Sequence, residues 1–159
     1  MSVVLFQVRG WTALIVAASG GHVEVCRLLL ENRCEKDITD DYGRTALMRA
    51  AVEGRLEVCR LLLENRCEKD ITDTDGSTAL HLAAEFGRLQ VTRYLVEQGG
   101  ISPLVKTHQL TDGSNIKICL YFRVRLHTIA AAKNVRQYKE VMEYLEVHMV
   151  LNYKCLHLE

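Results

Sequence analysis

The stretch EVCRLLLENRCEKDITD stands at residues 24–40 and again at residues 57–73, with identical letters and an offset of 33 residues. The same offset relates further positions along the chain: Gly10, Gly43 and Gly76; Thr12, Thr45 and Thr78; Gly21, Gly54 and Gly87; and the alanine pairs at 17–18, 50–51 and 83–84. Self-similarity at a fixed period of this size indicates a protein built from stacked repeats. The sequence therefore predicts three copies of one structural unit.

Each unit is expected to hold two helices. The first follows a glycine turn and begins after a threonine, whose hydroxyl can accept a hydrogen bond from a free amide of the first turn. The second has the sequences VEVCRLLLEN (23–32), LEVCRLLLEN (56–65) and LQVTRYLVEQ (89–98). Its apolar residues cover more than one narrow stripe, which is expected of a helix with a neighbour on both sides. A single unit has no closed core, whereas three stacked units do.

Two of the units, GRTALMRAAVEGRLEVCRLLLENRCEKDI (43–71) and GSTALHLAAEFGRLQVTRYLVEQGG (76–100), carry a family resemblance. They resemble the ankyrin repeat, whose pattern is G-x-T-P-L-H-x-A-A-x-x-G-H-x-E-V-V-x-L-L-L-x-x-G-A-D-V-N. The resemblance extends over residues 10–100. It implies an all-α solenoid of stacked antiparallel helix pairs, joined by β-hairpin loops that project sideways.

The units depart from this pattern in several places. Alanine replaces the proline of T-P-L-H in all three, and only His81 keeps the histidine. Arg33 and Arg66 stand where the family has a glycine in left-handed conformation, which costs a non-glycine residue roughly 1–2 kcal/mol. Either these arginines adopt that conformation, or Asn32 and Asn65 adopt it instead.

The domain boundaries follow from the period. Residues 1–9 are expected to form a partial N-terminal cap, followed by repeats at 10–42, 43–75 and 76–108. With so short a cap, Val25 and Leu28 are expected to face either the solvent or residues 1–9. Residues 109–150 are interpreted as a degenerate fourth repeat and residues 151–159 as a C-terminal tail.

An insertion near residues 115–125 is expected to split the fourth repeat. Apolar and polar residues alternate over IKICLYFRVRL (116–126), which is a strand pattern that ankyrin units lack. The preferred interpretation is a looped-out segment, and the alternative is an edge strand that recruits a partner. Beyond it, one face of a helix is predicted to carry Tyr138, Val141, Met142, Leu145 and Met149.

Composition excludes several function classes. The chain has 159 residues, of which 48% are apolar and 25% charged, and its formal net charge is zero. We expect one folded unit that is monomeric, with no electrostatic basis for binding nucleic acid and no segment apolar enough to span a membrane. The first ten residues lack the features of a secretory signal. We therefore expect a cytoplasmic or nuclear protein with free thiols.

Cysteine and histidine are interpreted as framework residues. Cys26, Cys34, Cys59 and Cys67 occupy small apolar slots of the repeat, where a free cysteine fits. His22 and Cys26 are spaced to share a helix face, but Arg55 replaces His22 in the second repeat, so no metal site is expected. The resemblance implies that His81 hydrogen-bonds to the backbone of the neighbouring repeat. Sequence motifs for catalysis or phosphate binding are absent, so we expect neither an enzyme nor a cofactor.

The expected binding surface consists of positions that differ between repeats on the loops and short helices. They are Trp11, Tyr42, Arg44, Arg49, Glu53, Asp75, Ser77, Glu85 and Phe86. Trp11 could equally shield the first repeat, and Asp37, Asp40, Asp70 and Asp73 are assigned mostly to turn structure. The predicted function is a non-catalytic adaptor or scaffold that binds a partner protein. The alternative is the targeting segment of a larger enzyme, such as a kinase or ubiquitin ligase.

Overall fold

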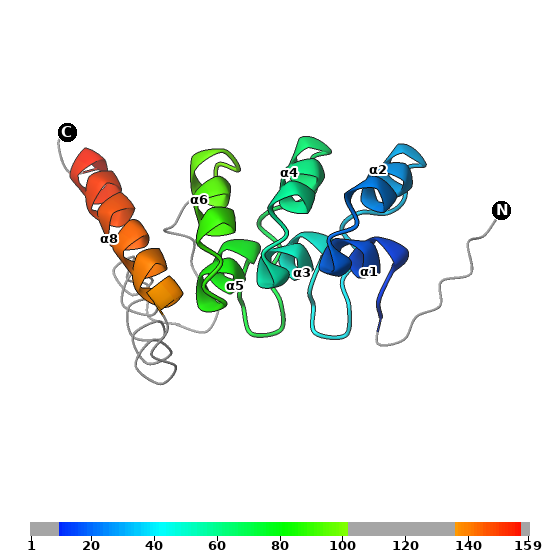
Figure 1. The fold of residues 1–159 in the computed structure, drawn as a ribbon, viewed down its shortest axis with the longest axis horizontal. Helices are drawn as coiled ribbons and strands as arrows, with labels where there is room; N and C mark the ends of the chain where they lie inside the picture. The colour runs from blue at the N-terminus through cyan, green and yellow to red at the C-terminus, as the bar shows by residue number, and fades with distance from the viewer. Residues whose placement is uncertain (1–9, 102–135, 157–159) are drawn as a thin grey trace.

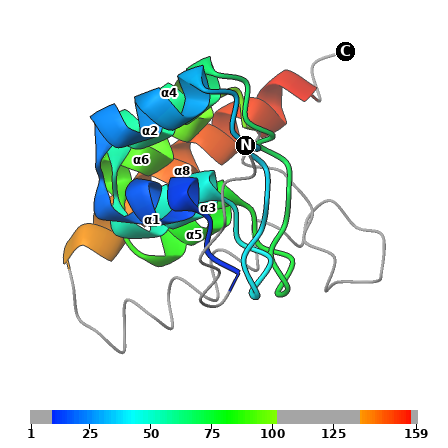
Figure 2. The same cartoon turned by 90° about the vertical axis from the view of Figure 1, so that its right-hand side faces the viewer.

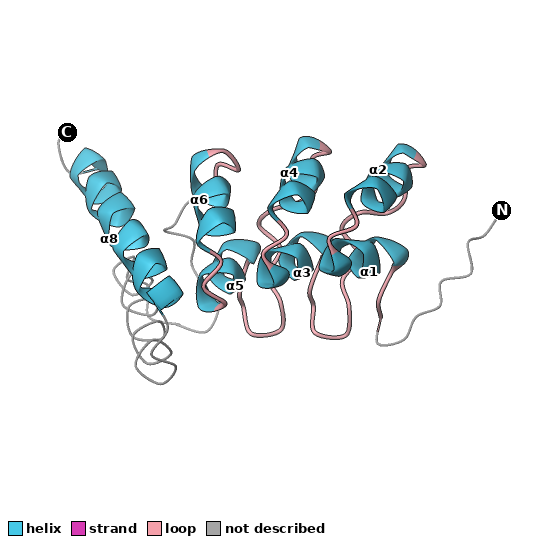
Figure 3. Ribbon diagram, in the orientation of Figure 1, coloured by secondary structure: helices cyan, strands magenta, loops and turns pink. Residues whose placement is uncertain are grey.

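The computed structural model describes residues 10–101 and 136–156. These ranges contain three helix pairs and one long helix. Their bounds are α1 Ala13–Gly20, α2 Val23–Glu31, α3 Ala46–Glu53, α4 Leu56–Glu64, α5 Ala79–Glu85, α6 Leu89–Glu97 and α8 Arg136–Leu156. The described ranges include no strand (Figure 3). The predicted cap at 1–9 and the predicted insertion at 115–125 lie outside the described residues.

The helix pairs stack in two parallel rows. Helices α1, α3 and α5 form one row and α2, α4 and α6 form the other (Figure 1). The loops at 32–45 and 65–78 extend beside each other from the same edge of the stack (Figure 2). The all-α, stacked helix-pair architecture predicted from the 33-residue period is confirmed.

Threonine and glycine set the bounds of the short helices. The hydroxyl oxygens of Thr12 and Thr45 accept hydrogen bonds from the amides of Ile15 and Met48, at 3.2 and 3.3 Å. Gly21 caps the C-terminal end of helix α1 and has a φ of +80°. This left-handed conformation is easily adopted by glycine and lets its amide reach the last carbonyls of the helix. The predicted threonine caps are therefore present.

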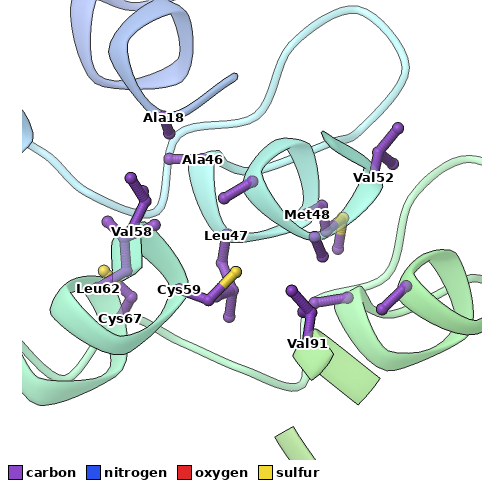
Figure 4. Packing of buried hydrophobic residues seen from close by; sticks show 14 of the residues in the cluster. Ala18, Ala46, Leu47, Met48, Val52, Val58, Cys59, Leu62, Cys67 and Val91 are labelled. Atoms are coloured by element: carbon purple, nitrogen blue, oxygen red, sulfur yellow. The ribbon is translucent and has the colours of Figure 1, made fainter. Parts of the chain in front are cut away.

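The core runs through all three helix pairs. The alanine pairs of α1, α3 and α5 are buried and let the short helices approach closely. Helix α3 packs between α1 and α5, and its buried Leu47 and Met48 belong to the same core as Val58, Cys59 and Leu62 of α4 (Figure 4). Full burial of such side chains contributes about 1.5–3 kcal/mol each. The core is therefore shared between repeats.

The second helix of each of the first two repeats ends in an unusual conformation. Arg33 and Arg66 have φ values of 56° and 59°. Asn32 and Asn65 keep negative φ values of −80° and −84°. The arginines themselves therefore occupy the glycine slot, and the suggestion that the asparagines take over this conformation is wrong.

Helix α8 packs against α5 and α6 and covers the third repeat. Val141 and Leu145 are buried and Met142 is half-buried, as predicted for one helix face, while the side chains of Tyr138 and Met149 lie outside what the structure describes. Tyr144 was not predicted to contact the stack, yet it is buried and its hydroxyl donates to Glu97 at 3.1 Å. The fourth-repeat interpretation remains a prediction, because most of that segment precedes α8.

Candidate functional site

The expected binding surface lies on the loops and short helices, which adjacent repeats place side by side (Figure 2). Tyr42, Arg44 and Asp75 come from the two projecting loops, and Arg49 and Glu53 come from α3. We call the partly or fully exposed residues of this region the loop-side surface. It comprises Trp11, Asp41, Tyr42, Arg44, Arg49, Glu53, Asp75, Glu85 and Phe86.

A buried aspartate organises each projecting loop. Asp40 Oδ1 accepts hydrogen bonds from the amides of Tyr42 and Arg44, both at 2.9 Å. Asp73 Oδ1 accepts in the same way from the amides of Asp75 and Ser77, at 3.0 and 2.8 Å. Aspartate commonly folds turns by bonding amides a few residues ahead. The structural role expected of Asp40 and Asp73 is confirmed.

Arginine side chains neutralise these two carboxylates. Arg49 forms a two-nitrogen contact with Asp40 Oδ2, with Nε at 2.8 Å. Arg44 Nε donates to Asp73 Oδ2 at 3.3 Å and so links one loop to the next. The carboxylate side chains of Asp40 and Asp73 are 0% and 1% exposed. A buried carboxylate that loses its cationic partner is strongly destabilising, so both arginines belong to the framework as well as to the surface.

The same arginines hold two aromatic rings. The guanidinium carbon of Arg49 lies 4.7 Å from the ring centre of Trp11 and 5.7 Å from that of Tyr42. Arg44 lies 6.0 Å from the Tyr42 ring centre. These are cation–π distances. Trp11 is half-buried against the core, whereas Tyr42 is 50% exposed. The repeats thus present partly exposed aromatic rings in fixed positions.

The remaining predicted residues differ in accessibility. Glu53 and Asp75 are exposed, and Glu85 and Phe86 are half-buried. Ser77 is only 2% exposed, because it lies inside the loop that Asp73 organises. This corrects the expectation for Ser77, which offers no exposed side chain to a partner.

The loop-side surface has an acidic excess. Arg44 and Arg49 are each paired with an aspartate, as described above. Asp41, Glu53 and Asp75 are exposed and form no ion pair within the described ranges. The accessible charge is therefore mainly negative, although the formal charge of the whole chain is zero.

The thiols and His81 contribute to the framework. The four described cysteines are free thiols. Burial raises the pKa of Cys26 to about 11 and that of Cys59 to about 12, so both stay protonated at neutral pH. His81 is buried, and its Nδ1 lies 2.8 Å from Thr78 Oγ1 and accepts from the Thr78 amide at 3.3 Å. The contacts between His81 and Thr78 form a cap for α5.

In the described ranges no three His, Cys, Asp or Glu residues gather as a metal site would require. None of the helices described is both long and apolar enough to cross a bilayer.

Sequence reasoning missed the pairing of charges. The sequence places Arg44 and Arg49 on the expected binding surface, but the structure also pairs them with Asp73 and Asp40. The sequence does contain an indication of these pairs, because Asp40 and Asp73 stand at the same position of consecutive repeats and a buried aspartate requires a cationic partner. The partner differs in each repeat, however, and lies 29 or 9 residues away.

Comparison with known proteins agrees with this architecture. A family model described as ankyrin repeats (3 copies) matches residues 4–73, and one described as ankyrin repeat matches residues 75–108. No curated protein matches the chain. Ankyrin repeats are generally non-catalytic modules that bind other proteins. The two matches cover well over half of the sequence, and the chain belongs to the ankyrin-repeat family.

Proposed function

We propose that this protein is a non-catalytic adaptor or scaffold that binds a partner protein through the loop-side surface. The main support is the pair of aromatic rings held by arginines. Tyr42 is 50% exposed, yet Arg44 and Arg49 flank its ring and both are themselves anchored to buried aspartates. Tyrosine, tryptophan and arginine are the residues most often found at the energetic centre of interfaces. Side chains already held in place lose little further freedom on binding.

The charge of the surface suggests the chemistry of the partner. Asp41, Glu53 and Asp75 are exposed acidic residues on the same loops and short helix as Tyr42, Arg44 and Arg49 or on the next loop. A partner with lysine or arginine beside an apolar patch would be complementary to them. Rim charges of this kind mainly accelerate association and make it dependent on salt. We therefore expect the association rate to fall as ionic strength rises.

The test separates binding from folding. The variant Tyr42→Ala/Glu53→Ala/Asp75→Ala changes exposed groups and leaves both arginine–aspartate pairs in place. The matched control is Glu24→Ala/Glu57→Ala/Arg60→Ala, which changes exposed residues on α2 and α4. Both variants should melt within a few degrees of the wild type.

Affinity capture followed by binding measurements with the purified partner gives the readout. A protein that binds the wild type and the control, but binds the first variant at least about tenfold more weakly, supports the proposal. If the control loses binding and the first variant keeps it, the partner uses the other row of helices.

A substitution of Arg44 and Arg49 is unsuitable for this purpose. It would leave the carboxylates of Asp40 and Asp73 buried without their cations. Such a change destabilises a protein by about 3–5 kcal/mol per pair. Lost binding would then report lost structure.

A further inference from the structure

Tyr42 differs from the other tyrosines whose side chains the structure describes. It lies in the turn of the loop between α2 and α3 and is 50% exposed. Within the described part of the chain its hydroxyl forms no hydrogen bond. Tyr94, in contrast, is half-buried on α6 under the guanidinium of Arg60, and Tyr144 is buried with its hydroxyl bonded to Glu97. Among the described tyrosine side chains, the exposed one with an unbonded hydroxyl is therefore Tyr42.

The loop accepts a negative charge at this position, as the next repeat shows. Asp75 stands 33 residues after Tyr42 and occupies the same place in the loop between α4 and α5. The amides of Tyr42 and Asp75 donate in the same way to the buried aspartate two positions earlier, at 2.9 and 3.0 Å. Asp75 is exposed, and its loop keeps the same turn. An anionic group on the Tyr42 side chain is therefore compatible with the folded loop.

Arg44 has unused hydrogen-bond donors beside the Tyr42 ring. Its guanidinium carbon lies 6.0 Å from the ring centre. In the described residues the Arg44 side chain donates only through Nε, to Asp73 at 3.3 Å, whereas Arg49 uses two nitrogens on Asp40. Arginine binds phosphate in a bidentate arrangement. The terminal nitrogens of Arg44 can therefore bind a phosphate on Tyr42 while Nε keeps its bond to Asp73.

The chain before Tyr42 is acidic, with aspartate at positions 37, 40 and 41. Asp41 is exposed and directly precedes the tyrosine. Kinases distinguish their substrates partly by such charge patterns. To enter an active site the turn has to open, which breaks the two amide bonds to Asp40. Opening of this kind is local to the loop, because the core lies in the helix pairs.

We propose that Tyr42 is a phosphorylation site, modified by a protein tyrosine kinase whose substrate cleft is basic, and that Arg44 binds the resulting phosphate. In the reaction the bond between the γ-phosphorus of ATP and the oxygen that bridges it to the β-phosphate breaks. A bond forms between that phosphorus and the Tyr42 hydroxyl oxygen. The phenolic proton passes to the catalytic aspartate of the kinase, and ADP leaves.

The modification regulates the loop-side surface, a consequence that rests on the function proposed above. A phosphate carries about −1.5 to −2 charges at neutral pH. A partner that packs an apolar patch on the Tyr42 ring would have to remove water from this group, which opposes binding. Phosphorylation therefore weakens partner binding, and a phosphatase restores it.

The first measurement follows phosphate transfer to the native full chain. The chain is incubated with ATP, magnesium and a tyrosine kinase domain that is active on acidic peptides, and peptide mass spectrometry locates the phosphate. It should appear on Tyr42 but not on Tyr94 or Tyr144. It should be lost at this site in Tyr42→Phe and appear several-fold more slowly in Asp41→Lys. Both substitutions change exposed residues, so both variants should keep the melting temperature of the wild type within a few degrees.

A peptide of residues 36–48 serves as the reference substrate, because it has the same local sequence without the fold. If Tyr42 stays unmodified in the native chain, the proposal is overturned, whether or not the peptide is modified. Modification of the peptide alone would show that the folded loop does not admit a kinase.

The second measurement asks whether Arg44 binds the phosphate. The second ionisation of a protein-bound phosphate has a pKa of about 6. Arg44 and Arg49 favour the dianion and lower this pKa, whereas Asp41, Asp75 and the two buried aspartates raise it. A phosphorus NMR titration of the phosphorylated chain should therefore give a lower pKa in the native state than in urea.

The matched control removes Arg44 together with its carboxylate. Arg44→Gln/Asp73→Asn leaves no buried charge unpaired, and the side-chain oxygen of the new asparagine can still accept from the amides of Asp75 and Ser77. This variant should be phosphorylated at Tyr42, and its phosphate pKa should move back toward the value in urea. A native pKa that is not lowered in the wild type, or that the double variant leaves unchanged, would overturn the role of Arg44.

The outcome is separate from that of the function proposed above. Phosphate transfer and the titration are both measured without the partner protein, so their failure leaves partner binding untouched. Equally, a partner that ignores the loop-side surface would leave the phosphorylation result standing.

Discussion

Replacing Arg66 by glycine should stabilise the protein, because a non-glycine residue occupies a left-handed position there. Its φ is 59°. This conformation brings Cβ close to the following carbonyl oxygen, which costs roughly 1–2 kcal/mol. Glycine removes that clash but makes the unfolded chain more flexible, which offsets the gain by about 0.4–1 kcal/mol. The net increase in the free energy of unfolding is therefore about 1 kcal/mol.

The assay is a comparison of three chains by thermal and urea unfolding. Arg66→Ala is the matched control, because it removes the same charged side chain and keeps Cβ. For a chain of this size, about 1 kcal/mol raises the melting temperature by roughly 2–4 °C. Arg66→Gly should reach that gain and Arg66→Ala should not. Arg33→Gly, where φ is 56°, should repeat the result. Equal melting temperatures for the glycine and alanine variants would refute the argument from backbone strain.

Further predictions concern the charge pairs, α8 and the thiols. Arg49→Ala should lower the free energy of unfolding by about 3 kcal/mol, because it leaves the Asp40 carboxylate buried without its cation, and adding Asp40→Asn should restore part of the loss in urea unfolding. Burial and a hydrogen bond to a carboxylate raise the pKa of Tyr144 to about 12. Its contribution to stability is therefore complete below about pH 10 and lost as the pH rises to 12. Tyr144→Phe should destabilise at pH 8 by about 1 kcal/mol, and the difference from the wild type should shrink over that alkaline window. Under native conditions at pH 8 iodoacetamide should modify Cys34, which is half-buried, well before the fully buried Cys59; the order is read by peptide mass spectrometry, and equal rates would contradict it.

The helical framework could be predicted because its causes are local and repeated. Threonine caps, glycine turns and paired alanines recur at one spacing, and each has a direct structural consequence. The burial of an individual helix face could not be predicted in the same way. Val25 and Val58 stand in identical local sequences, yet their exposed fractions are 49% and 1%, because burial depends on the neighbouring repeat.

The exposure of the predicted surface positions follows the sequence reasoning except at Ser77, which is buried, whereas the contacts among these residues could not be predicted. The ion pair between Arg44 and Asp73 connects residues 29 positions apart, and no local pattern specifies it. Likewise, a helical face drawn from sequence alone included Val141 and Leu145 and left out Tyr144, whose contact with Glu97 depends on how α8 sits against α6.

The position of α8 gives the stack two unequal ends. The third repeat lies between α4 and α8, whereas the first repeat has a described neighbour on one side only. In repeat arrays stability comes largely from contacts between adjacent units, so opening starts where such contacts are fewest. Transient unfolding should therefore begin at α1 and α2 and move toward the third repeat. A partner that binds Trp11 would bind only the folded form of the first repeat. Its measured affinity would therefore be reduced by the fraction of molecules in which this repeat is unfolded, and binding would suppress that unfolding.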